Sequence, residues 1–99
     1  MALLKELKRD VTKIANSSGL ESEVLPMKLY RPRGNLEPND WCCYKQMRII
    51  FKIDKAGNPI KRYVYCLSPY EWDKINECKK SYKEFLGLLN RRINEIFAA

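Results

Sequence analysis

The side chains best suited to chemistry are cations gathered in one short stretch, from Tyr44 to Cys66. Lysine and arginine bind phosphate oxygens, lysine as a point charge and arginine through a two-pronged guanidinium. This stretch holds six of them among three tyrosines: Lys45, Arg48, Lys52, Lys55, Lys61 and Arg62. The whole chain carries a formal charge of +7 from 19 basic and 12 acidic residues. Such an excess favours anionic partners, with nucleic-acid backbones as the first candidate.

The chain lacks the residues that several catalytic mechanisms need. The chain has no histidine, which removes Ser-His and Cys-His nucleophiles and the imidazole base that works near neutral pH. Neither G-x-G-x-x-G nor G-x-x-x-x-G-K-[ST], the loops that cradle phosphates, occurs in it. Its carboxylates are scattered among cations, and no pair stands in a recognisable catalytic context. We therefore expect a binding protein that is not an enzyme and needs no cofactor.

The cysteines do not indicate a metal site. Cys42 and Cys43 are adjacent, Cys66 and Cys78 stand apart, and no C-x-x-C pair or histidine could complete a zinc-binding set. No apolar run approaches the roughly 20 residues that a membrane span needs, and charged residues interrupt the first 15 positions, unlike a signal peptide. We expect reduced thiols in a cytoplasmic protein without a membrane partner, of a kind that phages and plasmids also encode.

The first half of the chain predicts a helix and then an interrupted strand. Apolar residues recur on one face over 2–17, and Gly19 suits the left-handed position beyond a helix end. The segment "EVLPMKLY" looks extended, but Pro26 cannot donate a hydrogen bond to a neighbouring strand, which indicates an edge strand or a broken one. Residues 31–40 then form an irregular loop, in which Arg31 and Arg33 could act as a basic arm.

The cationic stretch itself predicts a β-hairpin. Apolar and polar residues alternate from Gln46 to Ile53, and "DKAGN" supplies turn residues. A three-residue loop with Gly57 at its bulge would pair Phe51 with Lys61, Ile49 with Tyr63 and Met47 with Tyr65 on one face, and Ile50 with Arg62 and Arg48 with Val64 on the other. A two-residue turn at Ala56-Gly57 remains the alternative, and it would send the tyrosines to the opposite face.

A capping box opens the C-terminal helix. Ser68 is the N-cap, Pro69 takes the first helical position and Glu71 stands three residues after the cap. The apolar spacing continues to about Phe97, which would make a helix roughly 43 Å long at 1.5 Å per residue. Such a helix would overhang a domain of this size. Either it breaks near Gly87, the alternative that we prefer, or its far end packs on a second copy in a homodimer.

Two families offer a likeness. The run "MRIIFKIDKAGNPIKRYVYCLSPYEW" resembles the central hairpin of RelE-type messenger-RNA-cleaving toxins, which work on the ribosome without histidine. That resemblance would make Arg48, Arg62, Tyr63, Tyr65 and Tyr70 the residues to test. The order of one helix, three strands and a helix is similar to the double-stranded-RNA-binding domain, and "ECKKSYKEFLGLL" resembles its phosphate-gripping lysine run. In that family the lysines begin the last helix, whereas here we expect them a third of the way along it.

Together these patterns predict one small α+β domain over 1–99, with an N-terminal helix, an antiparallel sheet of two or three strands and a long C-terminal helix. One sheet face would be covered by helix and the other partly open. We expect the open face to bind nucleic acid or a nucleoprotein complex through Arg31, Arg33, Arg48, Lys52, Lys61 and Arg62. The alternative is an inhibitor or adaptor that docks on a single protein target through mixed apolar and charged surfaces around Ile50, Val64, Trp41 and Trp72. The RelE-like toxin is a further alternative.

Overall fold

The computed structural model describes residues 3–30, 44–53 and 61–97. They form the predicted α+β order, with the C-terminal helical region divided in two. The elements are α1 (Leu4–Ser17), β1 (Glu21–Tyr30), β2 (Tyr44–Ile53), β3 (Lys61–Leu67), α2 (Pro69–Ile75) and α3 (Lys79–Phe97). The predicted loop at 31–40 and the "DKAGN" turn lie outside the described residues.

Helix α1 is amphipathic, as its spacing predicts. Leu7, Val11 and Ala15 recur at four-residue intervals on one face and are buried. The helix ends where Gly19 adopts a φ of +67°, a left-handed conformation that glycine reaches without strain. The backbone N–H of Leu20 donates to the carbonyl of Ala15 at this end, which turns the chain back into β1.

The three strands form an antiparallel sheet in the order β1-β2-β3, so β2 is central. Of the two predicted alternatives for the first strand, the edge strand is confirmed, since β1 is continuous from Glu21 to Tyr30 and lies at the edge of the sheet. The β1–β2 register shifts between Leu25 and Lys28, where one extra residue enters β1 beside Pro26. A proline removes a ladder donor and is tolerated at an edge or a bulge, and β1 offers both.

The register of the hairpin differs from both predicted ones. The structure pairs Phe51 with Tyr63, Ile49 with Tyr65 and Met47 with Leu67, two residues away from our preferred register. The physical reason is the match of apolar residues: the fully buried Leu67 lies opposite Met47, and Lys61 is moved from the buried Phe51 to the half-buried Ile53. Because a shift of two keeps every side chain on its face, the preferred face assignment is correct.

The predicted break near Gly87 is wrong. Helix α3 runs through Gly87 without interruption, and the chain leaves helical geometry earlier, between α2 and α3 at residues 76–78. The capping box at Ser68 and Glu71 is confirmed and starts α2. The side-chain amide of Asn76 donates to the carbonyl of Trp72 at 2.9 Å and helps to end this helix. Phe85, Leu89 and Ile93 are buried on one side of α3, so packing outweighs the cost of the glycine, about 1 kcal/mol.

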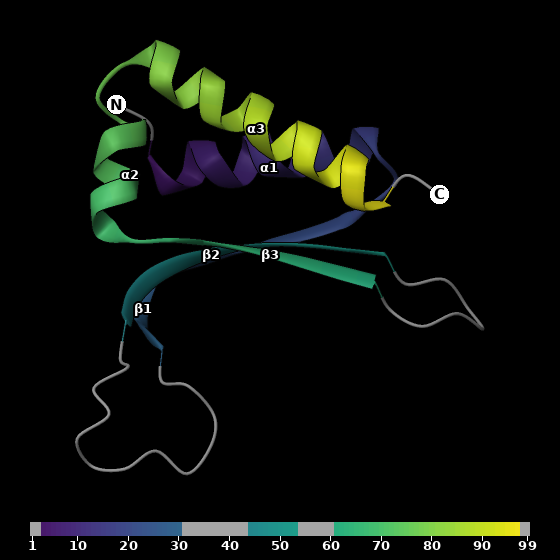
Figure 1. Cartoon of the computed structure of the whole chain (residues 1–99), viewed down its shortest axis with the longest axis horizontal. Coiled ribbons are helices and arrows are strands. Elements are labelled where there is room, and N and C mark those ends of the chain that lie inside the picture. Colours follow the sequence, from purple (N-terminus) through teal and green to yellow (C-terminus); the bar gives the residue numbers. More distant parts are fainter. Residues whose placement is uncertain (1–2, 31–43, 54–60, 98–99) are drawn as a thin grey trace, which may run out of the picture.

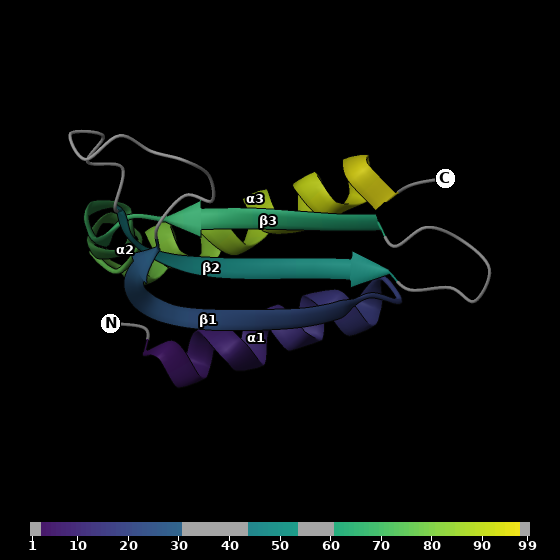
Figure 2. The same cartoon turned by 90° about the horizontal axis from the view of Figure 1, so that it is seen from below.

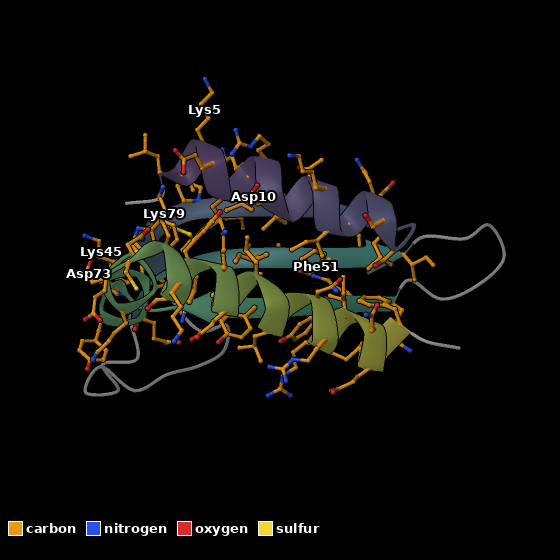
Figure 3. The ribbon with its side chains drawn as sticks, turned by 90° about the horizontal axis from the view of Figure 1, so that it is seen from above. Lys5, Asp10, Lys45, Phe51, Asp73 and Lys79 are labelled. Atoms are coloured by element: carbon orange, nitrogen blue, oxygen red, sulfur yellow. The ribbon has the colours of Figure 1, made fainter. Side chains whose placement is uncertain are left out.

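The helices form one layer over one face of the sheet (Figure 1). Seen from above, α1 and α3 lie side by side, and Phe51 of the central strand lies between them in this view (Figure 3). The core fills the space between the layers, with Leu7 and Val11 from α1, Ile49 and Phe51 from β2, and Leu89 from α3 among its most buried members. None of the described helices is long and apolar enough to cross a membrane.

Candidate nucleic-acid interface

The sheet face opposite the helices is uncovered by any described helix, and Figure 2 looks directly onto it. Its residues follow from strand alternation: Met47, Ile49 and Phe51 point into the core, so their neighbours on β2 point the other way. The pairing extends this set across the sheet to Glu21, Glu23, Leu25 and Lys28 on β1, Gln46, Arg48, Ile50 and Lys52 on β2, and Arg62, Val64 and Cys66 on β3. We call this set the open face.

Two cations stand directly opposite each other at one end of the open face. Lys52 on β2 pairs in register with Arg62 on β3, and both side chains are exposed. On its other side Lys52 pairs with Glu21, whose carboxylate lies 3.7 Å from the ammonium. Both partners of that ion pair are largely exposed, so the attraction between them is weak. The row Glu21–Lys52–Arg62 therefore keeps an excess positive charge.

Arg48 provides the second cationic row. It lies four residues from Lys52 on β2, about 14 Å along the strand. Its side chain is half-buried, and its Nε donates a hydrogen bond of 3.1 Å to Oε1 of Gln46. That bond holds the guanidinium near the next pair along, Lys28 and Gln46. Arg48 and Arg62 therefore share one uncovered face, at opposite ends of it.

Between the two cationic rows lies a row without cations. Glu23, Ile50 and Val64 pair across the three strands, and Ile50 is only 6% exposed. Ile50 is not part of the core between sheet and helices, which agrees with its place on the open face. The open face therefore alternates along the strands from positive, to apolar with one carboxylate, to positive again.

Not every predicted binding residue lies on this face. Lys61 pairs with Ile53, and its ammonium sits 5.8 Å from the ring centroid of Phe97 at the end of α3, on the side of the helices. The structure thus brings Arg48, Lys52 and Arg62 onto one face and separates Lys61 from them. Arg31 and Arg33 lie outside the described residues.

The residues implied by the RelE resemblance are not brought together. Tyr63 and Tyr65 lie on the covered face, opposite to Arg48 and Arg62. Tyr65 packs edge-to-face on Phe85 with ring centroids 5.6 Å apart. Burial raises the pKa of Tyr65, and the nearby Glu71 carboxylate adds to the rise. Tyr70 is exposed on α2 and lines a groove together with Tyr65, on the covered side of the sheet and not with the two arginines.

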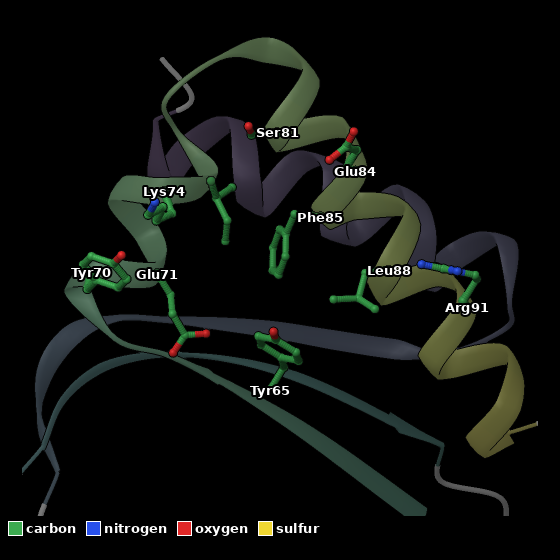
Figure 4. Close-up of a pocket in the computed structure, with 10 residues that line it drawn as sticks. Tyr65, Tyr70, Glu71, Lys74, Ser81, Glu84, Phe85, Leu88 and Arg91 are labelled. Carbon is green, nitrogen blue, oxygen red and sulfur yellow. The ribbon is translucent and has the colours of Figure 1, made fainter.

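The residues expected to form a protein-docking surface are also divided. Trp72 on α2 packs against the core, whereas Ile50 and Val64 lie on the open face. Trp41 lies outside the described residues. A separate groove of about 410 Å³ opens between α2, β3 and α3, where Figure 4 shows Tyr65, Phe85 and Leu88 at its apolar floor. Glu71 and Arg91 lie on its rim.

A second group of cations lies at the start of α3, which sequence reasoning missed. Lys79 and Lys80 are the first two residues of this helix, not residues a third of the way along a longer one. The sequence feature that marks the start of this helix is Cys78, which caps it. Its Sγ lies 3.4 Å from the backbone nitrogen of Ser81 and 3.2 Å from the hydroxyl oxygen of the same residue. These hydrogen bonds, led by the hydroxyl, lower the pKa of the Cys78 thiol.

Within the described ranges, no group of three or more cysteine, aspartate or glutamate side chains could hold a metal ion. The site has to be judged on its own geometry, because comparison with protein-family models, with curated proteins and with solved structures finds no match to this chain. Its chemistry is that of charge: the exposed Lys52 and Arg62 and the half-buried Arg48 stand at fixed spacing on a sheet that packs on the core behind it.

Proposed function

We propose that this protein binds nucleic acid, alone or within a nucleoprotein complex, through the open face of its sheet and without catalysis. The observation that carries the proposal is the register of Lys52 and Arg62, two exposed cations directly opposite each other on neighbouring strands. Like charges in this position destabilise a sheet, by up to about 1 kcal/mol. An anionic partner removes that cost, because its phosphates neutralise both side chains.

The exposed cations of the open face are better placed for contacts with phosphates than for contacts with base edges. Arg62 has no ion-pair partner within the described chain, and Lys52 has only the exposed Glu21. Long side chains on a rigid sheet can reach a phosphate backbone without a change of fold. Contacts of this kind make affinity fall steeply with salt, since each neutralised phosphate releases a counterion.

Fluorescence anisotropy with a labelled 16-base-pair DNA duplex and its single strand, titrated from 50 to 200 mM salt, tests the proposal. We expect Lys52→Ala and Arg62→Ala each to weaken binding by roughly three- to tenfold at 50 mM salt and to lower the salt slope by about 1. Lys13→Ala on α1 and Arg91→Ala on α3 are matched controls, since both are exposed cations in the helix layer. These controls should keep the wild-type affinity within twofold.

Two results would count against the proposal. One is the absence of binding to duplex or single strand at 50 mM salt, and the other is an equal loss in the control variants. Affinity capture with and without nuclease then tests the remaining alternative, a protein that docks on another protein. A single stoichiometric protein that stays bound after nuclease treatment would favour an inhibitor or adaptor instead.

A second candidate within the same class is an RNA duplex gripped at the start of α3. The observation that favours it is the position of Lys79 and Lys80 as the first residues of that helix, with no acidic residue in its first turn. Cations are disfavoured at a helix N-terminus unless an anion lies nearby. This position removes one difference from the double-stranded-RNA-binding domain, whose lysines begin the last helix, while α2 between β3 and α3 remains a second difference. Lys79→Ala with Lys80→Ala should then weaken RNA-duplex binding and leave DNA binding to the open face unchanged.

A further inference from the structure

We propose that the nucleic acid bound at the open face is a DNA duplex, placed so that the strands of the sheet cross its major groove. One phosphate backbone would lie at Lys52 and Arg62, and the other at Arg48 and Lys28. The proposal rests on the proposed function and adds to it the form of the nucleic acid and its orientation. Four side chains from three strands are involved, and all belong to the open face.

The spacing of the cationic rows fits two phosphate backbones. The row of Lys52 and Arg62 lies about 14 Å along the strands from Arg48, and Lys28 lies one row further. Successive nucleotides of one nucleic-acid strand are much closer together than the two cationic rows, since each nucleotide rises by about 3.4 Å along a duplex. The two backbones that border the major groove of B-form DNA are separated by a groove about 12 Å wide. Flexible lysine and arginine side chains can span the difference between the spacing of the rows and the width of the groove.

The row between the cations carries no positive charge. Glu23, Ile50 and Val64 offer one negative charge and two apolar side chains at the centre of the open face. A single strand running along the middle of the face would bring its phosphates onto the Glu23 carboxylate. With a duplex in the proposed orientation, the central row faces the groove and not a backbone. A carboxylate over the major groove can accept a hydrogen bond from cytosine N4.

The part of the open face between the cations has no aromatic residue. Proteins that bind single strands place aromatic side chains under successive bases. The rows from Glu21–Lys52–Arg62 to Lys28–Gln46 contain none, because Tyr63 and Tyr65 lie on the covered face, and the pair Tyr30 and Tyr44 follows only at the end of the sheet. These rows thus have charges for phosphates but no platform for unpaired bases.

The open face also has a suitable shape. Figure 1 shows β1 and β2 bending away from the helix layer near the end of β1 and the start of β2. This bend follows the register shift between Leu25 and Lys28, and bulges bend the strand that carries them. The bend makes the open face concave along the strand direction and turns its Lys28 end toward a bound molecule. A concave face suits the convex outline of a duplex.

A duplex in which one backbone carries no charge tests this inference separately from the proposed function, which is nucleic-acid binding through the open face. The probes are a 16-base-pair DNA duplex, the same duplex with one strand replaced by its methylphosphonate analogue, and the isolated DNA strand. Four neutralised phosphates predict a salt slope of about −3.6 for the normal duplex. We expect the half-neutral duplex to show about half that slope and at least tenfold weaker binding at 50 mM salt. The isolated strand should also bind at least tenfold more weakly than the duplex.

Some results would overturn this inference alone, and others would also overturn the proposed function. Equal or tighter binding of the single strand, or an unchanged affinity for the half-neutral duplex, overturns the inference and leaves the proposed function standing. No binding of any probe overturns both. Arg48→Gln and Arg62→Gln provide a second measurement, each expected to lower the duplex slope by about 1. A loss confined to Arg62→Gln, with Arg48→Gln folded by circular dichroism and binding as wild type, would show that only one row touches the duplex and would also overturn the inference.

Discussion

The hydroxyl of Tyr82 on α3 donates a hydrogen bond of 2.5 Å to Oδ2 of Asp10 on α1. The two residues are 72 positions apart in the sequence, and the bond joins the first helix to the last. The carboxylate is also held by Arg9, whose Nε lies 3.7 Å from Oδ1. Both helices cover the same sheet face, so this bond fixes their spacing over the core.

Removal of that hydroxyl should destabilise the fold. Tyr82→Phe keeps the ring and loses a charge-assisted hydrogen bond at a half-buried site, and we expect a loss of about 1 kcal/mol in the free energy of unfolding. Urea denaturation followed by circular dichroism measures it. Tyr70→Phe is the matched control, because Tyr70 is 69% exposed, and it should change stability by less than about 0.5 kcal/mol. Equal effects of the two substitutions would refute the role given to the bond.

The same contact predicts a loss of stability in alkali. Desolvation raises the pKa of Tyr82, and the hydrogen bond to Asp10 and the negative charge of that carboxylate raise it further. A tyrosine with a raised pKa in the folded state keeps its stabilising contribution below the unfolded pKa, about 10, and loses it as the pH rises above that value. Wild type should therefore lose more stability than Tyr82→Phe between pH 9 and pH 11. Tyr65, whose pKa is also raised, contributes equally to both proteins and cancels in the comparison.

Glycine substitutions should have opposite signs at two positions. Gly87 lies inside α3 with open space around an added methyl group, so Gly87→Ala should stabilise the protein by about 0.5–1 kcal/mol. Gly19→Ala should destabilise it by about 1 kcal/mol, because Gly19 has a φ of +67°. Thermal melts at one protein concentration measure both. A destabilised Gly87→Ala would mean that another molecule packs closely on this part of α3.

These residues also show what sequence patterns could and could not predict. The capping box at Ser68, the edge strand indicated by Pro26 and the amphipathic α1 depend on local chemistry, and all three are confirmed. Helix α3 passes through Gly87 because long-range burial of Phe85 and Leu89 outweighs a local penalty, and residue spacing alone does not measure that balance. The hairpin register depends on which apolar residues meet across strands. The faces of the preferred register are correct because a two-residue shift keeps each side chain on its face, whereas the alternative register would have exchanged them.

The candidate site was predictable to a similar degree. Alternation along β2 and β3 placed Arg48, Lys52 and Arg62 on one face, as the structure has them, but Lys61, a predicted member of the same group, lies on the other. Their order across the sheet, with Lys52 directly opposite Arg62 and Glu21 beside it, needed the register of all three strands. The cations at the start of α3 were missed because a cap formed by Cys78 is weaker as a sequence signal than one formed by serine or aspartate.

Cys78 should be the more reactive of the two described thiols. Its pKa is lowered chiefly by the hydroxyl of Ser81, and the side chain is exposed at the start of α3. Alkylation by iodoacetamide at pH 7, mapped by mass spectrometry of the peptides, should modify Cys78 faster than the exposed Cys66. Ser81→Ala removes the main hydrogen bond and should slow Cys78 without changing Cys66. Equal rates in the wild type would contradict this.

Arg62→Glu should separate binding from stability, since it changes the two in opposite directions. The substitution replaces a like-charge pair with an opposite-charge pair, so that Lys52 stands between Glu21 and a new carboxylate. We expect the free energy of unfolding to rise by a few tenths of a kcal/mol, because the pair is exposed. DNA affinity should fall by more than it does for Arg62→Ala, because the new charge repels phosphate. Arg91→Glu changes the net charge by the same amount on the helix layer and controls for nonspecific attraction. If both variants lose affinity equally, the net charge of the protein, and not the open face, determines binding.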